Sequence, residues 1–493
     1  MIYNPGKIGL IKIANRQTLD ISTSDAATAG LVLDRTASAP MHAQLTLQLR
    51  EMILTGRIQP GARLPASRLL ALELGVSRIT VTTSMDQLIA EGFLEGVQGR
   101  GLFVVSALPD TALKNAASPD GFELEQLPGN AARAVPFQPS SHDPRLFPDK
   151  EWAKLLERGW LREKWQIAPI GAAGFGPLRE AIARHLNEWR GLRCQPSQVF
   201  ITTGGVDAIQ LIIRAIGLSG KAVVLEDPGY PLFANELSHH GAHVVAVAVD
   251  EQGICPGHMP AAAMVIVTPS RHFPNGASMP VSRRLDLLAW SKRHDAMIVE
   301  DDFDSEYRYR GTPLPTLMGQ DGLDRVIYLG SFSKVFSPLL RLGYIIVPPS
   351  RVEQFNGLIN ERGAVASATA QPALARFMLS GAFAAHIRRM RRIYSSRQDA
   401  LIASVGRHLG GLLSVQREAG GMHLVARIAP ELGWRMNDVQ ISDCARAAGL
   451  ALSALSSYCT GPAPQQGLLM GYSGFQDEEL EAACQRLANA LQA

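Results

Sequence analysis

The chain has 493 residues, of which 46% are hydrophobic and 19% charged, and its net charge is +3. This length exceeds one ordinary domain, and the composition excludes a disordered protein while permitting contact with nucleic acid. The five cysteines lack CxxC or CxnH spacing, which indicates reduced thiols rather than a disulfide framework or a zinc site. No apolar run approaches the roughly 18–20 residues of a membrane helix, and we recognise no signal peptide, so we expect a cytoplasmic protein.

Changes in composition and periodicity divide the chain into four segments. Residues 1–30 have little pattern and are predicted to be a flexible extension, followed by a compact helical unit over residues 31–106. Residues 107–135 are rich in Ala, Pro, Asp and Gly, which predicts a linker. Over residues 136–493 apolar runs alternate with amphipathic stretches, which predicts an α/β domain.

The compact unit is predicted to contain three helices and a β-hairpin. The first helix, in "MHAQLTLQLREMILTG", has one apolar face that consists of Leu45, Leu49, Met52 and Ile53. A short second helix ends at Gly75, and Ser77 is the predicted N-cap of the third helix. The segment "FLEGVQGRGLFVV" then predicts two short strands around a glycine-rich tip. This order is typical of a winged helix-turn-helix, whose third helix enters the major groove of duplex DNA.

Polar side chains suited to reading DNA are concentrated on the predicted third helix. An arginine can bind guanine with two hydrogen bonds, whereas Ser and Thr hydroxyls bind phosphates or bases. The candidates on this helix are Ser77, Arg78, Thr80, Thr82 and Thr83. Ser67 and Arg68 begin the second helix, where a phosphate can meet a helix N-terminus, and Arg100 lies at the tip of the hairpin. Residues 40–106 hold six arginines and no lysine against five acidic residues, so composition alone leaves a helical interaction domain as an alternative.

A long motif over residues 61–81, G-x-x-L-P-A-S-R-x-L-A-x-x-L-G-V-S-R-x-T-V, bears on this choice. With its flanking segments it resembles the winged helix of the GntR family. The resemblance implies that Arg68, Arg78 and Arg100 contact DNA. Because the basic field is weak, we expect useful affinity to need two such domains on two half-sites.

Seven continuous apolar runs are the predicted strands of the α/β domain. They are "QVFITT", "AVVLED", "HVVAVAV", "MVIVTPS", "AMIVEDD", "RVIYLGS" and "LGYIIVP". Continuous runs predict strands that are buried on both faces, and hence a mostly parallel sheet covered by helices.

Four motifs at the ends of these runs bring together an anion site, an aromatic ring, carboxylates and a lysine. The segment "TTGGVDAIQLI" places Gly204, Gly205 and Val206 at the start of a helix, where their amides can hold an anion. The segment "EDPGYP" presents Tyr230, and "VEDDFDSEY" ends a strand in carboxylates. The segment "YLGSFSKVFSPLLR" contributes Ser331, Ser333, Lys334 and Arg341.

Together these groups suit one cofactor, pyridoxal 5'-phosphate (PLP). A desolvated lysine is nucleophilic enough to form an imine with the aldehyde, and a carboxylate keeps the pyridine nitrogen protonated. Helix amides, hydroxyls and an arginine bind the phosphate, and an aromatic ring stacks on the pyridine. Taken singly, the same motifs also allow a solvated loop lysine and either a solvated acidic rim or a divalent-metal site.

In this order and spacing, residues 136–493 resemble the fold type I, class I aminotransferases, which have a smaller C-terminal subdomain. The whole chain resembles the MocR subfamily of GntR regulators. That resemblance implies a homodimer that binds operator DNA and senses PLP or an amine or amino-acid effector, and not an enzyme.

The resemblance also assigns roles to individual residues. It implies that Lys334 forms the imine and that Tyr230 stacks on the ring. It implies that Asp301, rather than Asp302, pairs with the pyridine nitrogen. It places the phosphate at the amides of residues 204–206 and at Ser331, Ser333 and Arg341.

Two phenylalanines depart from the aminotransferase pattern. Phe303 stands where the family has a tyrosine, and Phe273 stands where aminotransferases have an asparagine. Two donors to the phenolic oxygen of PLP are therefore missing, for which Arg271, His272 or Asn275 are candidate replacements.

The segments predicted to bind the ligand also differ from the pattern of the related proteins. The segment "GLLMGYSGF" over residues 467–475 lacks the arginine that holds the substrate carboxylate in aminotransferases. Leu232 replaces an arginine present in regulators that sense γ-aminobutyrate. A ligand carboxylate is then bound only if Arg271 or Arg427 turns inward. We therefore predict a regulator, with two alternatives: a working aminotransferase with a DNA-binding appendage, or a module that has lost PLP.

Overall fold

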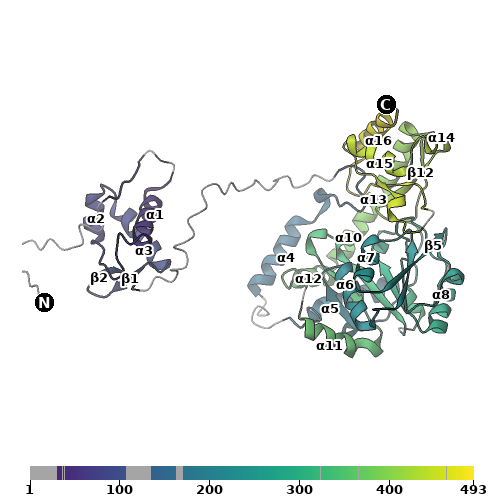
Figure 1. Ribbon diagram of the computed structural model, residues 1–493, viewed down its shortest axis with the longest axis horizontal. Helices are drawn as coiled ribbons and strands as arrows, with labels where there is room; N and C mark the ends of the chain where they lie inside the picture. Colours follow the sequence, from purple (N-terminus) through teal and green to yellow (C-terminus); the bar gives the residue numbers. More distant parts are fainter. Residues whose placement is uncertain are drawn as a thin grey trace, which may run out of the picture. The chain divides into compact units, whose positions relative to one another are not determined.

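The computed structural model describes residues 30–35, 37, 39–106, 135–162, 170–322, 324–364, 366–461 and 464–492. Contacts between Cα atoms divide the chain into two compact units, Met1–Gly129 and Asn130–Ala493 (Figure 1). Apart from Gly30 and Val135, the predicted extension and the predicted linker lie outside the described residues. Their structure stays a prediction.

The first unit contains three helices and a hairpin. Its elements are α1 (Met41–Leu54), α2 (Ser67–Glu73), α3 (Arg78–Ala90), β1 (Leu94–Val97) and β2 (Gly101–Val104). The two strands pair antiparallel, and the predicted apolar face of α1 is buried in one core with residues of α3 and of both strands. The predicted winged helix-turn-helix is therefore confirmed.

The start of α3 is fixed by a side-chain cap. Ser77 Oγ accepts a hydrogen bond from the backbone N–H of Thr80 (3.1 Å) and lies 2.8 Å from Thr80 Oγ1. The predicted N-cap is thus confirmed, and it orients the helix that the sequence assigns to the major groove.

Loss of this cap is expected to loosen α3 without unfolding the unit. Ser77→Ala removes one acceptor for the free N–H groups of the first turn, which costs about 1 kcal/mol of helix stability. Hydrogen exchange of the first-turn amides in the full-length protein should accelerate about fivefold. Thr83→Ala, an exposed change on the same helix, is the control and should leave that exchange slow. Equal rates in the two variants would contradict the capping role.

An eight-stranded sheet forms the centre of the second unit, in the order β3-β10-β9-β8-β7-β4-β5-β6. The strands are β3 (Val199–Thr202), β4 (Ala222–Asp227), β5 (His243–Asp250), β6 (Gly253–Ile254), β7 (Met264–Val267), β8 (Met297–Asp302), β9 (Val326–Ser331) and β10 (Gly343–Ile346). All seven predicted strands are present, and the run from β9 to β5 is parallel, which confirms the mostly parallel sheet. However, β10 is antiparallel to both of its neighbours, and the sequence pattern does not predict β6.

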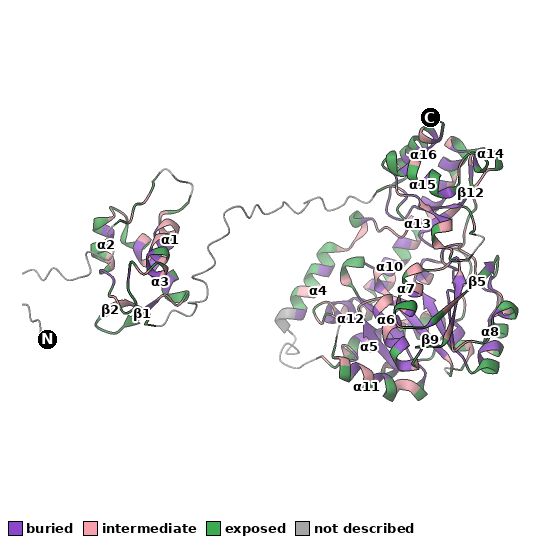
Figure 2. Cartoon of the chain, viewed as in Figure 1, coloured by how far each residue is buried: buried purple, intermediate pink, exposed green. Residues whose placement is uncertain are grey.

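Both faces of this sheet are buried, as the continuous apolar runs predict (Figure 2). Along β8, Ile298 belongs to one hydrophobic core, whereas Met297 and Val299 belong to the other. Helices that contribute to the first core are α5 (Gly176–Arg190), α8 (Val281–His294) and α12 (Gln371–Leu379). Helices that contribute to the second core are α6 (Gly205–Ile216), α7 (Pro231–His239) and α11 (Val352–Arg362).

A smaller antiparallel sheet forms the C-terminal part of this unit, in the order β11-β12-β14-β13 (Figure 1). Its strands are β11 (Leu413–Val415), β12 (His423–Ile428), β13 (Ser453–Ala454) and β14 (Leu468–Gly471). The helices of this region are α13 (Ala382–His408), α14 (Pro430–Gly433), α15 (Asp438–Ala447) and α16 (Asp477–Gln492). The remaining helices of the unit are α4 (Asp149–Arg162), α9 (Leu317–Gln320) and α10 (Phe332–Val335). None of the helices in the described ranges has the length and apolar character needed to cross a bilayer.

The large sheet brings the predicted site motifs to one edge. In the register of β10, Gly343 pairs with both Thr202 of β3 and Ser331 of β9, so these two strands end side by side around it. The parallel register of β8 and β9 pairs Asp301 with Leu329. Ligands of α/β sheets bind beyond the carboxyl ends of their strands, which is where these motifs lie.

Candidate functional site

Lys334 lies on the one-turn helix α10, which begins directly after β9. Ser331 caps this helix, because its Oγ accepts a hydrogen bond from Ser333 N–H (3.2 Å). Lys334 is half-buried, and we find no hydrogen bond or ion pair to its amine within the described residues. Burial lowers the pKa of Lys334, and the nearby carboxyls of Asp304 and Asp301 oppose this effect. An unpaired amine with a lowered pKa is suited to attack an aldehyde.

Asp301 and Asp302 end β8 and face different surroundings. Asp302 Oδ2 accepts hydrogen bonds from Tyr328 Oη (2.6 Å) and from Arg190, so this carboxylate is held in the interior. Asp301 is buried and has no such partner among the described residues, and its electrostatic interactions include that with Lys334. This difference supports Asp301 as the carboxylate for a pyridine nitrogen.

Burial, followed by the neighbouring carboxyls, raises the pKa of Asp301 to about 8. Between the pKa of the unfolded chain, near 3.9, and this value, the folded protein holds a proton that the unfolded chain releases. Asp301 therefore makes the cofactor-free protein less stable as pH rises from about 4 to 8. A bound pyridinium would supply the missing partner.

Asp301→Asn is expected to stabilise the cofactor-free protein at pH 8 while weakening PLP binding. The amide never ionises, so the free energy of unfolding should rise by roughly 1–3 kcal/mol, because a buried carboxylate without a partner costs more than a neutral amide. The rise should vanish below about pH 3, where Asp301 is protonated in both states. Denaturant unfolding at the two pH values measures it. Asp302→Asn, which disrupts the contacts with Arg190 and Tyr328, should destabilise the protein instead.

Tyr230 forms the wall of a pocket next to Asp301. Tyr230 follows the turn after β4 and is the N-cap residue of α7. Its exposed fraction is 40%. The pocket is lined by Leu225, Glu226, Gly229, Tyr230, Phe233, Ile266, Val267, Thr268, Phe273 and Asp301. Burial and the charge of Asp301 raise the pKa of Tyr230, so its ring carries no charge at neutral pH. An open aromatic face beside a buried carboxyl suits a flat heteroaromatic ring.

The predicted phosphate end is built from backbone as well as side chains. Gly204 has a φ of 140°, a conformation that favours glycine, and it is the N-cap of the 12-residue helix α6. The first turn of α6 and the cap of α10 meet at Gly343, where an added Cβ would lie 3.0 Å from Gly204 Cα. Arg341 is exposed, and its charge lowers the pKa of Tyr230, which places it near the same pocket. The donor set therefore fits a phosphorylated pyridine aldehyde.

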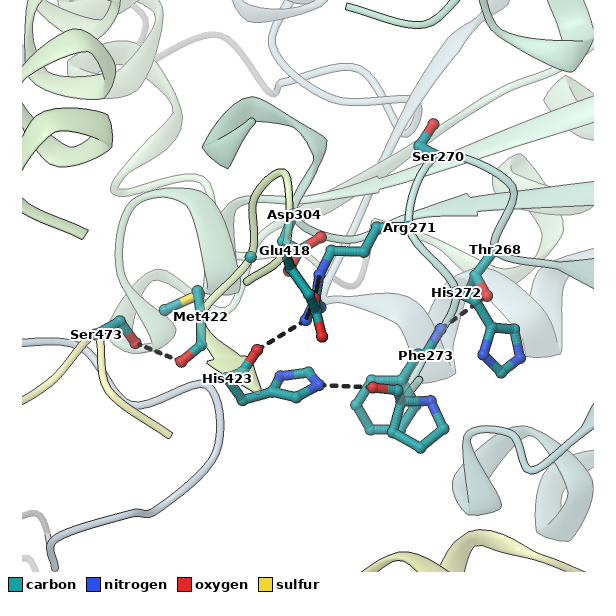
Figure 3. A network of polar contacts seen from close by, with 12 residues as sticks. Thr268, Ser270, Arg271, His272, Phe273, Asp304, Glu418, Met422, His423 and Ser473 are labelled. Carbon is teal, nitrogen blue, oxygen red and sulfur yellow. Dashed lines mark hydrogen bonds and ion pairs between the residues drawn. The ribbon is translucent and has the colours of Figure 1, made fainter. Parts of the chain in front are cut away.

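Arg271 is turned inward but is fully engaged with other groups (Figure 3). Its Nη2 donates to Glu418 Oε2 (2.8 Å) and to the carbonyl of His423 (2.9 Å), and its Nη1 donates to Asp304 Oδ2 (3.2 Å). The other candidate for a ligand carboxylate, Arg427, is exposed on β12. Binding of a ligand carboxylate would require a free, inward-facing guanidinium. Neither Arg271 nor Arg427 provides one.

Of the two other candidate replacements for the missing donors, Asn275 is engaged elsewhere, whereas His272 Nε2 has no hydrogen-bond partner among the described residues. His272 is buried with Nε2 3.7 Å from Glu226, and burial lowers the pKa of His272 to about 3. Asn275 Nδ2 donates to Gln465 Oε1 (3.0 Å). Sequence reasoning missed Glu418, which pairs with Arg271, and Tyr458, whose ring centroid lies 5.4 Å from that of Phe273. Neither belongs to a motif, and both come from the C-terminal subdomain.

In the first unit, some of the predicted DNA-contact residues make hydrogen bonds within their own helix and some are exposed, and Ser77 does both. Ser77 and Thr80 bond to each other, and Thr82 Oγ1 donates to the carbonyls of Arg78 (3.1 Å) and Ile79 (3.0 Å). The exposed candidates are Arg68, Ser77, Arg78, Thr83 and Arg100. The hydroxyls of Thr80 and Thr82 thus serve the helix itself, and the arginines remain the strongest candidates for base contacts.

Two known families match the two units. Residues 42–104 match the family described as bacterial regulatory proteins, gntR family, and residues 148–487 match aminotransferase class I and II. Among solved structures, the chain is 21% identical to Pyrococcus horikoshii kynurenine aminotransferase, with a TM-score of 0.65, covering 73% of this chain and 91% of that chain. Thermus thermophilus LysN, an alpha-aminoadipate aminotransferase, is 24% identical with a TM-score of 0.65 and covers 73% and 92%. The fold and the site define a winged-helix DNA-binding unit joined to an aminotransferase-like, fold type I domain.

Relatives along almost the whole chain are transcriptional regulators. The chain is 37% identical over 477 residues to the probable rhizopine catabolism regulatory protein MocR of Rhizobium meliloti, covering 94% of this chain and 96% of the relative. It is 34% identical to the pyridoxine biosynthesis transcriptional regulator PdxR of Corynebacterium glutamicum, covering 91% and 95%. The chain belongs to the MocR subfamily of GntR-type transcriptional regulators, which confirms the resemblance seen in the sequence.

Proposed function

We propose that this regulator holds PLP on Lys334 and changes its affinity for operator DNA when PLP or an amine ligand occupies the site. The observation that carries the proposal is a half-buried lysine near a buried Asp301, neither with a hydrogen-bond partner for its side chain among the described residues, beside an open aromatic ring. The name of one relative, a regulator of pyridoxine biosynthesis, supports PLP itself as one candidate effector. Because its target is operator DNA, we place the protein in the cytoplasm.

When bound, PLP supplies an aldehyde that reacts reversibly with primary amines and a ring that accepts electrons. Lys334 provides the amine, and its lowered pKa increases the fraction that is unprotonated and reactive. Asp301 holds the proton on the pyridine nitrogen, and Tyr230 covers one face of the ring. The amides of residues 204–206, with Ser331, Ser333 and Arg341, bind the phosphate.

Regulation requires that the ligand bind two arrangements of the protein with different affinities. A typical coupling of about 1–3 kcal/mol changes operator occupancy by roughly five- to 150-fold. We propose a homodimer, since two winged helices on two half-sites compensate for the weak basic field of one. The aminotransferase-like domain then changes how the two winged-helix units bind the operator.

A spectrum of the full-length protein incubated with PLP tests the proposal. Covalently bound PLP absorbs at about 330–430 nm, and a protein that stays colourless after dialysis would contradict the proposal. The same preparation, mixed with common amino acids and 2-oxoglutarate, tests the alternative of a working aminotransferase. We expect no sustained turnover, because Arg271 is held by Glu418 and Asp304.

A further inference from the structure

Five aromatic rings, centred on Phe273, form a wall at the pocket that contains Asp301. The ring of Phe273 meets four others edge-on, with centroid distances of 5.7 Å to Tyr230, 5.6 Å to Phe303, 5.9 Å to His423 and 5.4 Å to Tyr458. We call these five residues the aromatic wall. Tyr458 is fixed in it because its carbonyl accepts a hydrogen bond from Gly229 N–H (2.9 Å). The wall is therefore a built feature, to which both subdomains contribute.

The aromatic wall is partly open and lies close to the reactive amine. Phe273, Phe303 and Tyr458 are half-buried, Tyr230 is exposed, and Phe273 lines the cofactor pocket. The charge of Lys334 acts on His423, a member of the wall, and Phe303 lies in the chain between Asp301 and Asp304, which both interact with Lys334. A ligand that approaches Lys334 thus meets aromatic surface.

Two groups at the aromatic wall that could meet a ligand carboxylate, Arg271 and His423, are not available to it. Asp301 and Asp304 are buried carboxyls, whereas burial and Arg271 lower the pKa of His423 well below its usual value, so this ring stays neutral. The guanidinium of Arg271 is buried, and Glu418 and Asp304 compensate its charge. To bind a ligand carboxylate, Arg271 would have to give up Glu418. A carboxylate without a partner is strongly disfavoured in such surroundings.

We propose that the amine ligand of this site is a primary amine with an aromatic or other apolar body and no carboxylate. This inference rests on the proposed function, and it names the class of effector for the same site. Phe273 and Phe303 are its specificity-determining residues, since they place apolar rings where aminotransferases hold polar donors. Glu418 acts indirectly, as the group that withholds Arg271 from the ligand.

A matched pair of ligands tests the inference on the PLP-loaded, full-length protein. The pair is 2-phenylethylamine and L-phenylalanine, which differ by one carboxylate. Binding is followed by the change in cofactor absorbance and by the shift in the midpoint of thermal unfolding. We expect 2-phenylethylamine to bind at least about tenfold more tightly than L-phenylalanine. Ethylamine, which lacks the aromatic body, should bind about tenfold more weakly than 2-phenylethylamine.

A variant of Glu418 tests the reason for the preference. Glu418→Gln removes the carboxylate that holds Arg271, so the affinity for L-phenylalanine should rise about tenfold while that for 2-phenylethylamine changes less than about threefold. Glu481→Gln is the matched control, because Glu481 pairs with Arg407 on the exposed surface of the same subdomain. That control should leave both affinities unchanged. If Glu418→Gln fails to fold, the ligand pair on the natural protein decides the question.

The outcomes separate this inference from the proposed function. L-Phenylalanine binding as tightly as 2-phenylethylamine, or no binding of either amine to a protein that carries PLP, would overturn the inference alone. A protein without any cofactor absorbance would overturn the proposed function first. A tenfold preference for the amine that Glu418→Gln reduces would support both.

Discussion

Replacing Lys334 by alanine is expected to abolish covalent attachment of PLP. No other lysine is part of the predicted site, and the alanine side chain cannot react with the aldehyde. Asp301, Tyr230 and the phosphate-binding groups remain, so PLP should still bind, but reversibly and more weakly. The measurement is the absorbance at about 330–430 nm that survives dialysis, together with mass spectrometry after borohydride reduction.

The natural control is Lys292→Ala, which removes an exposed lysine at the end of α8. It should keep the full cofactor spectrum and the mass increment on Lys334. Retention of reduced, covalently bound PLP in Lys334→Ala would show that another amine carries the cofactor. Because Lys334 is half-buried and without an ion-pair partner among the described residues, its removal should leave the stability of the fold largely unchanged.

The second large effect, a loss of operator affinity, is expected from Arg78→Ala in the winged-helix unit. Arg78 is exposed on the first turn of α3, and no residue of the described chain holds its guanidinium. A bidentate contact to a guanine edge is worth about 1–3 kcal/mol, and a dimer loses it at two half-sites. Operator affinity should therefore fall by at least about 30-fold. Fluorescence anisotropy with the operator and with an unrelated duplex measures both affinity and specificity.

Arg50→Ala is the control for that loss. Arg50 lies on α1 and pairs with Glu91 (2.7 Å), the C-cap residue of α3, so its removal changes the net charge by the same amount without changing the first turn of α3. It should lower affinity for both duplexes slightly and equally. An equal loss in Arg50→Ala and Arg78→Ala would show that only net charge matters and would contradict base reading by Arg78.

Local patterns predicted the winged helix well because each of its elements carries its own signal. The apolar face of α1, the cap at Ser77 and the glycine-rich hairpin tip are encoded within a few residues, and the structure contains each of them. Burial patterns likewise predicted the seven main strands. The two-residue strands β6 and β13 are too short to carry such a pattern, and the antiparallel direction of β10 depends on topology rather than on composition.

The candidate site likewise has one part that local motifs predict and another part that they do not. Lys334, Asp301 and Tyr230 lie at strand ends, where the order of the motifs places them together. The contacts of Arg271 with Glu418, and of Phe273 with Tyr458, join residues more than a hundred positions apart. Whether an inward arginine is free or paired depends on side chains of another subdomain, which no local motif encodes.

The most direct test of the account is the affinity of the full-length protein for its operator, measured with and without PLP. The operator can be obtained by selection from random duplexes. We predict that PLP, alone or with 2-phenylethylamine, changes the affinity of the natural protein by roughly five- to 150-fold and has a smaller effect on Lys334→Ala, which binds PLP more weakly. Identical affinities under all of these conditions would show that the pocket does not control operator binding by the winged-helix units, and would contradict the account.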